Sequence, residues 1–274
     1  YDGFICCYPV EFCIFFELWN KPIIIVNCIR YEHPYTRNID RWNELNNVLL
    51  SLNDKKLLYF VSNNKGDQIY AEYFLKKIKP IWIPSLCEYT KSYYKPEKKK
   101  FIITTRSHID NVNHELCVHI SNLKPYTWED TYKYKGFIFN PYHNGCMTIF
   151  ECYTANIPMF FPSKNFGKKL LKKGMMFQDL TFYKIYGEKE PEEIDNPNNL
   201  SNPKNIDMWF DTCDFYDQEN MPYCIYYNSF EELNDLIKTI SDDELNEISN
   251  KMKIFNIERK KMVYNKWSKI LENL

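Results

Sequence analysis

The segment from residue 136 to residue 158 restricts the possible folds of this chain more than any other. An apolar run from Phe137 to Phe139 is followed by a short polar loop that contains Gly145, and then by a segment with helical character from Met147 to about Asn156. This order predicts a strand, a loop and a helix. A helix that begins directly after a buried strand directs its unpaired N–H groups and the positive end of its dipole at the sheet edge, where they favour an anionic group such as a phosphate.

Side chains in this segment fit the same kind of ligand. Gly145 allows a close approach of the backbone, with Asn144 beside it, and His143 and Thr148 can donate hydrogen bonds. One helical turn further on, Glu151 can accept hydrogen bonds from paired hydroxyls such as those of a ribose. The alternative is an ordinary α/β loop before a capped helix, because a His and a Glu at a fixed offset often occur by chance.

This stretch resembles the donor-binding segment of the GT-B glycosyltransferases. In the UDP-sugar transferases of that superfamily, a His is followed at fixed spacing by Gly, by Ser or Thr, by Glu and then by Gly-x-Pro. His143, Gly145, Glu151 and Pro158 keep that spacing here, and Thr148 occupies the hydroxyl position. The resemblance implies two Rossmann-like domains that face a cleft, and a donor site formed by these residues.

Two positions depart from the family pattern, and a third residue bears on the stereochemistry. Asn156 stands where the family usually has Gly, and Asn is the next-best occupant of a left-handed position at the end of a helix. Met147 replaces a polar residue, which leaves the identity of the sugar more open. Retaining members of the superfamily carry an additional Glu eight residues before the Glu that matches Glu151. His143 occupies that place here, so the resemblance favours an inverting transferase.

Strands and helices alternate along the rest of the chain, which predicts parallel sheets covered on both faces. The spacing of Phe12, Phe15, Phe16 and Trp19 predicts a helix with one apolar face, and a helix cap is expected at Ser62-Asn63-Asn64. Capping boxes at residues 229–232 and 241–244 predict that two helices begin there. We expect a first Rossmann-like domain at residues 1–96 and a second at 97–274, with a linker over residues 88–100. The first domain is short for the superfamily and is expected to be truncated. The final helix, after Ser241, resembles the GT-B helix that crosses back to the first domain. Residues 30–33, 83–87 and 150–163 also look like segments of uncharacterised glycosyltransferases from protists and large DNA viruses.

Composition excludes some partners and favours a reducing compartment. The chain of 274 residues has 35 basic and 36 acidic residues, so nothing in its charge argues for nucleic acid or a membrane surface. Its ten cysteines contain no Cys-x-x-Cys pair and lie mostly in apolar runs, which indicates free, buried thiols and a cytoplasmic or cytosol-facing location. The sequence has no apolar stretch long enough to cross a bilayer.

Candidate catalytic residues lie in the first domain, where strands end. Glu32 and His33 follow the apolar run from residue 22 to residue 28, and either could be the general base that deprotonates an acceptor hydroxyl. The simpler interpretation is a loop salt bridge between Arg30 and Glu32. Glu11 has a similar, weaker claim after the first strand. In the second domain, Arg106 follows a strand and could neutralise a diphosphate, although a surface role is equally compatible.

These features together predict a metal-independent, inverting glycosyltransferase of the GT-B type that needs no cofactor beyond its nucleotide-sugar substrate. The acceptor would be a hydroxyl of a glycan, a protein or a lipid. Asp207, Asp211 and Asp214 lack the tight Asp-x-Asp of metal-dependent GT-A transferases, so no metal site is expected. Two alternatives stay open: a noncatalytic module that binds a nucleotide sugar or a glycan, and a nucleotide-sugar epimerase.

Overall fold

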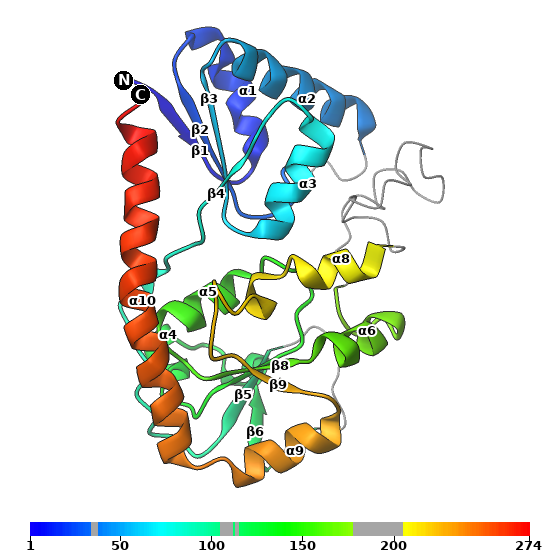
Figure 1. Ribbon diagram of the computed structural model, residues 1–274, viewed down its shortest axis with the longest axis vertical. Helices are drawn as coiled ribbons and strands as arrows, with labels where there is room; N and C mark the ends of the chain where they lie inside the picture. The colour runs from blue at the N-terminus through cyan, green and yellow to red at the C-terminus, as the bar shows by residue number, and fades with distance from the viewer. Residues whose placement is uncertain (34–37, 105–111, 113–114, 178–204) are drawn as a thin grey trace. The chain divides into compact units, whose positions relative to one another are not determined.

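The computed structural model describes residues 1–33, 38–104, 112, 115–177 and 205–274 (Figure 1). The chain divides into two compact units. Unit 1 consists of Tyr1–Ser85, Leu180–Asp214 and Met262–Leu274, and unit 2 consists of Leu86–Asp179 and Phe215–Lys261. Each unit contains one parallel β-sheet, so the prediction of mixed α/β structure with parallel sheets is confirmed.

The sheet of unit 1 has four parallel strands in the order β1-β2-β3-β4. Its strands are β1 (Phe4–Cys6), β2 (Ile23–Asn27), β3 (Leu58–Ser62) and β4 (Ile81–Trp82). The helices between them are α1 (Cys13–Phe16), flanked by 3-10 turns, α2 (Ile39–Asp54) and α3 (Lys65–Leu75), and α8 (Ile206–Asp211) joins the unit from later in the chain. The N-cap of α3 is Asn64, as the Ser62-Asn63-Asn64 sequence predicted.

Alternation along the central strands directs one set of side chains toward α1, α2 and α3. Ile23 and Ile25 of β2 and Phe60 of β3 join the main core of the unit, together with Trp42 and Leu49 of α2. The other face of the sheet carries the C-terminal residues of the chain. There the Tyr59 hydroxyl donates to the carbonyl of Asn273 at 2.6 Å, and the Lys266 ammonium donates to the carbonyl of Trp82 at 2.9 Å. Figure 1 shows the last turns of α10 (Asp242–Leu271) on that side.

The sheet of unit 2 has five parallel strands in the order β6-β5-β7-β8-β9. They are β5 (Phe101–Thr104), β6 (Cys117–His119), β7 (Phe137–Phe139), β8 (Met159–Pro162) and β9 (Ile225–Tyr227). The helices are α4 (Trp128–Thr131), α5 (Met147–Thr154), α6 (Lys164–Lys172), α9 (Phe230–Thr239) and α10 as far as Lys261. Aromatic rings stack on the middle strands of this sheet. The ring centroids of Phe139 and Phe161 are 5.1 Å apart, and those of Phe161 and Phe215 are 4.6 Å apart.

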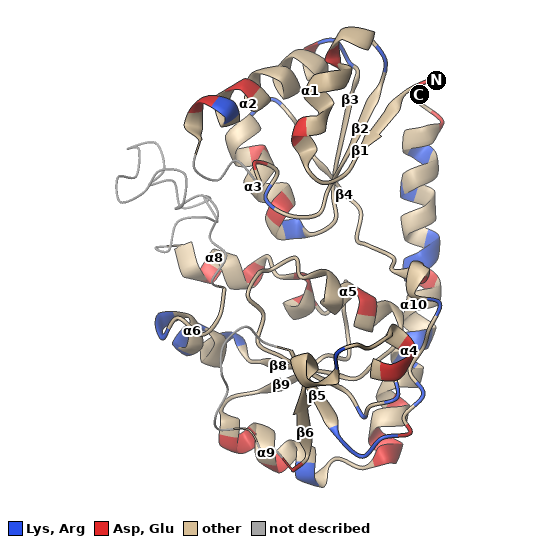
Figure 2. Ribbon diagram, turned by 180° about the vertical axis from the view of Figure 1, so that it is seen from behind, with Lys and Arg blue, Asp and Glu red and all other residues tan. Residues whose placement is uncertain are grey.

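Local signals set several helix ends in unit 2. Ser229 caps α9, and the Ser241 amide and hydroxyl both bond the Glu244 carboxylate before α10, as the two capping boxes predicted. Asn156 follows α5 with a φ of 62°, the left-handed conformation expected for that position. Lysines are grouped on α6, whereas α10 mixes both signs of charge along its length (Figure 2).

The segment from residue 88 to residue 100, expected as a linker, belongs to unit 2. Its backbone is hydrogen-bonded along that unit: the amide of Tyr94 donates to the carbonyl of Ala155, and the amide of Lys95 donates to the carbonyl of Tyr132. Its composition is polar because it runs over the surface of the unit, where the charged side chains stay in water.

Two further findings concern apolar side chains and cysteines. Of the four aromatic residues expected on one helical face between residues 9 and 19, only Phe16 packs against the core of unit 1, and its ring centroid lies 4.3 Å from that of Phe4. The other three, Phe12, Phe15 and Trp19, are exposed. The 3-10 turns on either side of α1 shift the angular positions that a continuous α-helix would give. All ten cysteines are free and eight are buried, as expected. No helix in the described part of the chain has the length and apolar character needed to span a membrane.

Candidate functional site

The predicted strand, loop and helix are present in unit 2 as β7, residues 140–146 and α5. Gly136 lies at the start of β7, where a side chain would be blocked, because an added Cβ would lie 2.7 Å from the carbonyl oxygen of Pro158. The amide of Phe137 donates to the same carbonyl at 3.0 Å. The Gly at one end of the segment and the Pro at the other therefore fix β7 against β8, and the loop between them opens at the carboxyl edge of the sheet.

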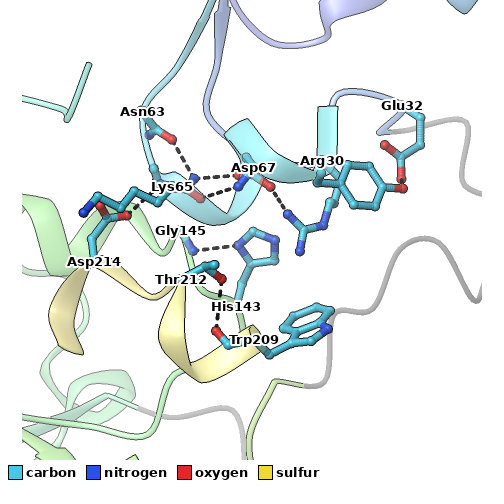
Figure 3. Close-up of polar contacts among 12 residues, drawn as sticks. Arg30, Glu32, Asn63, Lys65, Asp67, His143, Gly145, Trp209, Thr212 and Asp214 are labelled. Atoms are coloured by element: carbon cyan, nitrogen blue, oxygen red, sulfur yellow. Dashed lines mark hydrogen bonds and ion pairs between the residues drawn. The ribbon is translucent and has the colours of Figure 1, made fainter. Parts of the chain in front are cut away.

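His143 stabilises this loop from inside. Its Nδ1 accepts a hydrogen bond of 2.9 Å from the amide of Gly145, as Figure 3 shows, and the Cys146 thiol donates to the carbonyl of His143. Because Nδ1 accepts, the neutral imidazole carries its proton on Nε2, which can donate. The Gly145 amide, which we expected to bind a phosphate, is bonded to His143 in this conformation.

The first turn of α5 lies beside a cavity. The N-cap residue is Cys146, whose side chain does not cap the helix, so the helix N-terminus keeps the character of an anion site. A cavity of about 190 Å³ lies next to it and includes Thr148. The cavity is lined by Thr104, Ile120, Tyr126, Phe139, Asn140, Pro141, Tyr142, Cys146 and Thr148. Since ligand sites usually measure about 300–1,000 Å³, this cavity is sized for part of a ligand.

Two buried amides of the loop before α5 have unused hydrogen-bonding capacity: Asn140, which lines the cavity, and Asn144, which is not among its lining residues. The side chain of Asn140 donates from Nδ2 to the carbonyl of Met175 at 2.7 Å, but its Oδ1 has no hydrogen-bond partner among the described residues. Asn144 has none for either amide atom, although it is almost fully buried. Buried polar atoms in folded proteins are nearly always paired, so exceptions mark positions where a ligand or water completes the bonding.

Glu151 lies one turn further along α5 and is held by an aromatic residue. The Tyr89 hydroxyl donates to Oε1 of Glu151 at 2.5 Å, and the Tyr89 ring packs edge-on against Trp128 at 5.4 Å. Both rings are partly exposed. A carboxylate beside two accessible aromatic rings can bind a ligand that combines a flat ring with a pair of hydroxyls.

In unit 1, the carboxyl ends of β2 and β3 meet in a buried polar cluster. Arg30 forms an ion pair with Asp67 through Nη1, and Asp67 also accepts from Nδ2 of Asn64 at 2.6 Å (Figure 3). The Arg30–Glu32 salt bridge suggested by the sequence is wrong. Arg30 instead pairs with a carboxylate from α3, because that helix begins directly above the end of β3.

Glu32 is fully buried and bonded to a neutral partner. The Tyr70 hydroxyl donates to its Oε1 at 2.6 Å. Burial raises the pKa of Glu32 to about 7, although the Tyr70 hydrogen bond and the charge of Arg30 act in the opposite direction. A carboxyl group with a pKa near 7 can exchange a proton at neutral pH, which is the property that a general base needs.

The other two candidates of the first domain lie around a different tyrosine. The Tyr8 hydroxyl is 2.6 Å from Nδ1 of His33, at the surface. Glu11 is partly buried, and burial raises its pKa while the charge of Arg41 lowers it. Glu32 and His33 are therefore neighbours in sequence with different partners, and the structure does not bring them together.

Arg106 lies outside the described residues. Sequence reasoning did not identify Asn140, Tyr89 or Trp128 as site residues. Asn140 could have been found from its place directly after β7. Trp128 could have been found from the capping box at Thr127, which marks it as the first residue of a helix. Tyr89 gave no signal, because it lies in the segment interpreted as a linker.

Comparison of the chain with models of protein families, with curated proteins and with solved structures finds no match. Within the described residues, there is no group of three or more His, Cys, Asp or Glu side chains that could hold a metal ion.

Proposed function

We propose that this protein is a glycosyltransferase of the GT-B type, which binds a nucleotide-sugar donor on unit 2 and a hydroxyl acceptor on unit 1. The observation that carries the proposal is the first turn of α5 beside a cavity at the carboxyl edge of the unit 2 sheet, with the unpartnered buried amide of Asn144 in the same loop. A helix N-terminus attracts an anion, and amide groups add hydrogen bonds to it. A diphosphate meets both requirements.

Tyr89, Trp128 and Glu151 suggest how the rest of the donor binds. The two partly exposed rings offer a surface on which a nucleobase can stack, and the Glu151 carboxylate next to them can accept from the ribose hydroxyls. In the proposed complex, the ribose hydroxyls compete with the Tyr89 hydroxyl for the carboxylate. This arrangement keeps the role that the family resemblance gives to Glu151.

The proposed reaction is a metal-independent, inverting transfer. The acceptor oxygen forms a bond to the anomeric carbon of the sugar, the bond from that carbon to the diphosphate oxygen breaks, and the nucleoside diphosphate leaves. The acceptor proton passes to a base, for which Glu32 is the best candidate because its pKa of about 7 suits proton exchange. Donors preorganised at α5 would stabilise the charge that develops on the leaving diphosphate.

The main competing proposal is a noncatalytic module that binds a nucleotide sugar without transfer. It is favoured by the complete burial of Glu32 and by its short hydrogen bond to Tyr70, since a base must reach the acceptor proton. The two proposals differ in whether nucleoside diphosphate is released from the donor. A transferase releases it on transfer to the acceptor, and slowly by hydrolysis when water is the acceptor, whereas a binding module does not release it. An epimerase would instead interconvert the free donor without any acceptor.

A thermal-shift panel of UDP-, GDP- and CMP-sugars tests donor binding, because a ligand of the folded state raises the melting temperature. We expect a shift with one nucleotide class, and its loss in Glu151→Ala. The fold should persist in that variant, because the Tyr89–Glu151 bond is accessible to water. Glu247→Ala on the surface of α10, which removes an exposed pair with Lys251, is the matched control and should keep the shift. An equal shift in Glu151→Ala would contradict the proposal.

A further inference from the structure

The polar cluster at the sheet edge of unit 1 contains more hydrogen-bonding capacity than the protein itself uses. The guanidinium of Arg30 is completely buried and pairs with Asp67 through Nη1, yet Nε and Nη2 have no partner among the described residues. Nε and Nη2 form one edge of the guanidinium and direct two N–H groups in parallel. That edge matches the two oxygens of a carboxylate or a phosphate in a bidentate pair.

The guanidinium is held in one orientation. Its Cζ lies 4.4 Å from the centre of the Tyr70 ring and 5.2 Å from the centre of the Trp209 ring, and Asp67 is fixed in turn by Asn64. Figure 3 shows one nitrogen of Arg30 directed at Asp67. Stacking and the ion pair therefore fix the unpartnered edge before any ligand arrives, which lowers the ordering cost of binding.

Two more buried groups without partners lie at the same edge. Asn27 ends β2 and Ser62 ends β3, and the two are paired in register. Neither the amide atoms of Asn27 nor the hydroxyl of Ser62 has a hydrogen-bond partner within the described residues. Their backbone is connected to the cluster, because the Asn63 amide donates to the Asn27 carbonyl at 3.0 Å. Open α/β sheets bind ligands at this edge.

Leaving so many buried polar atoms unpaired costs stability unless a ligand uses them. We propose that unit 1 contains an oxyanion-binding site in which the Nε–Nη2 edge of Arg30 binds a carboxylate, with Asn27 and Ser62 binding polar groups next to it. Asp67 already balances the charge of Arg30, so any bound anion adds net negative charge to the cluster. A carboxylate fits better than a dianionic phosphate because it adds one such charge and the phosphate adds two.

This inference rests on the proposed function in one respect: it gives the acceptor a chemical class, a hydroxyl compound that carries a carboxylate, such as a sugar acid. The site itself belongs to unit 1, whereas the donor residues belong to unit 2. Because Arg30 is buried, entry of a ligand requires local opening. The short helix α8 that carries Trp209 is the element to move, since its ring covers the guanidinium.

Titration calorimetry with sodium glucuronate tests the site, with glucose as the neutral analogue and inorganic phosphate as the competing oxyanion. We expect glucuronate to bind, and glucose and phosphate to bind at least about tenfold more weakly. Arg30→Lys keeps the positive charge and the ion pair to Asp67 but removes the parallel N–H edge, so it should weaken glucuronate binding by about tenfold or more. Equal binding of glucose, or tighter binding of phosphate, would overturn the carboxylate assignment.

Asn27→Leu is a second variant with a readout that a purely structural role would not produce. Leucine has a similar volume and no polar atoms, so the melting temperature should be unchanged or higher, while glucuronate binding weakens. If this variant binds glucuronate as well as the wild type, Asn27 is not part of the site. The nucleotide-sugar thermal shift should survive in both variants. Its absence in the wild type would contradict the proposed donor site without affecting the result for glucuronate.

Discussion

The two units use the same part of a parallel sheet in different ways. In unit 1, three ionisable side chains that follow β2 and β3 are fully buried: Arg30, Glu32 and Asp67. Arg30 forms an ion pair with Asp67, and Glu32 accepts a hydrogen bond from Tyr70. In unit 2, the end of β7 is followed by neutral amides, a helix N-terminus and a cavity, and Glu151 on α5 is bonded to a partly exposed tyrosine.

This contrast shows that similar topology does not fix how a site is stabilised. Charges taken out of water need partners, so removal of one partner in unit 1 leaves an isolated buried charge or an unpaired donor. Groups that water can reach have a substitute for a lost partner. We therefore expect removal of a partner from the charged groups at the unit 1 edge to lower the stability of the fold, whereas loss of a partner at the unit 2 edge should change stability much less.

The largest effect should come from Asp67→Ala, because it leaves the guanidinium of Arg30 buried without its carboxylate. We expect a loss of about 3–5 kcal/mol in the free energy of unfolding, measured by urea denaturation. The control is Asp54→Ala, which removes an exposed pair with Lys77 and should change stability by less than about 0.5 kcal/mol. Similar values for both variants would show that the cluster is not a buried ion pair in solution.

The second effect is a pH dependence that originates from Glu32. Its pKa is about 7 in the folded protein, against 4.5 for an ordinary Glu, so between these values the folded state retains a proton that the unfolded state has released. Stability contributed by this group should therefore fall as pH rises through that window, by up to roughly 3 kcal/mol.

Unfolding by urea at a series of pH values, compared between wild type and Glu32→Gln, isolates this contribution. Glutamine cannot ionise, so the difference between the two proteins should grow in favour of the variant from about pH 4.5 to pH 7. A constant difference across the series would mean that Glu32 ionises at an ordinary pH.

The smallest effects come from a matched pair of identical substitutions, one in each unit. Tyr70→Phe removes the donor of the buried Glu32 carboxyl and should cost about 1–3 kcal/mol. Tyr89→Phe removes the donor of Glu151, where water can take its place, and should cost less than about 1 kcal/mol. Equal costs, measured by thermal or urea unfolding, would remove the distinction between the two edges.

The sequence was informative where structure depends on neighbouring residues. Capping residues such as Asn64 and Ser229, and the left-handed Asn156, follow from interactions within a few residues, and they were predicted correctly. Apolar periodicity located the strands of both sheets for the same reason. The helix around α1 was misjudged, because short 3-10 turns change the spacing of side chains without changing composition.

The contacts that define the candidate sites join residues far apart in the chain. Arg30 and Asp67 are separated by 37 residues, and Tyr89 and Glu151 by 62, so spacing alone did not reveal either pair. The raised pKa of Glu32 has its largest cause in burial, which depends on the packing of the whole unit rather than on its neighbours in sequence. The sequence therefore located the strand ends, and the structure showed which side chains meet there.

The division of the chain has a consequence for the order in which the protein folds during synthesis. The polypeptide passes between the units four times, at residues 85, 179, 214 and 261, and residues 262–274 belong to unit 1, which also contains Tyr1–Ser85. The ribosome therefore completes β1 to β4 long before the helical turns that cover one face of their sheet. We expect unit 1 to expose that apolar face until residues 262–274 have been synthesised, which makes chaperone binding and slow, long-range assembly part of its biogenesis.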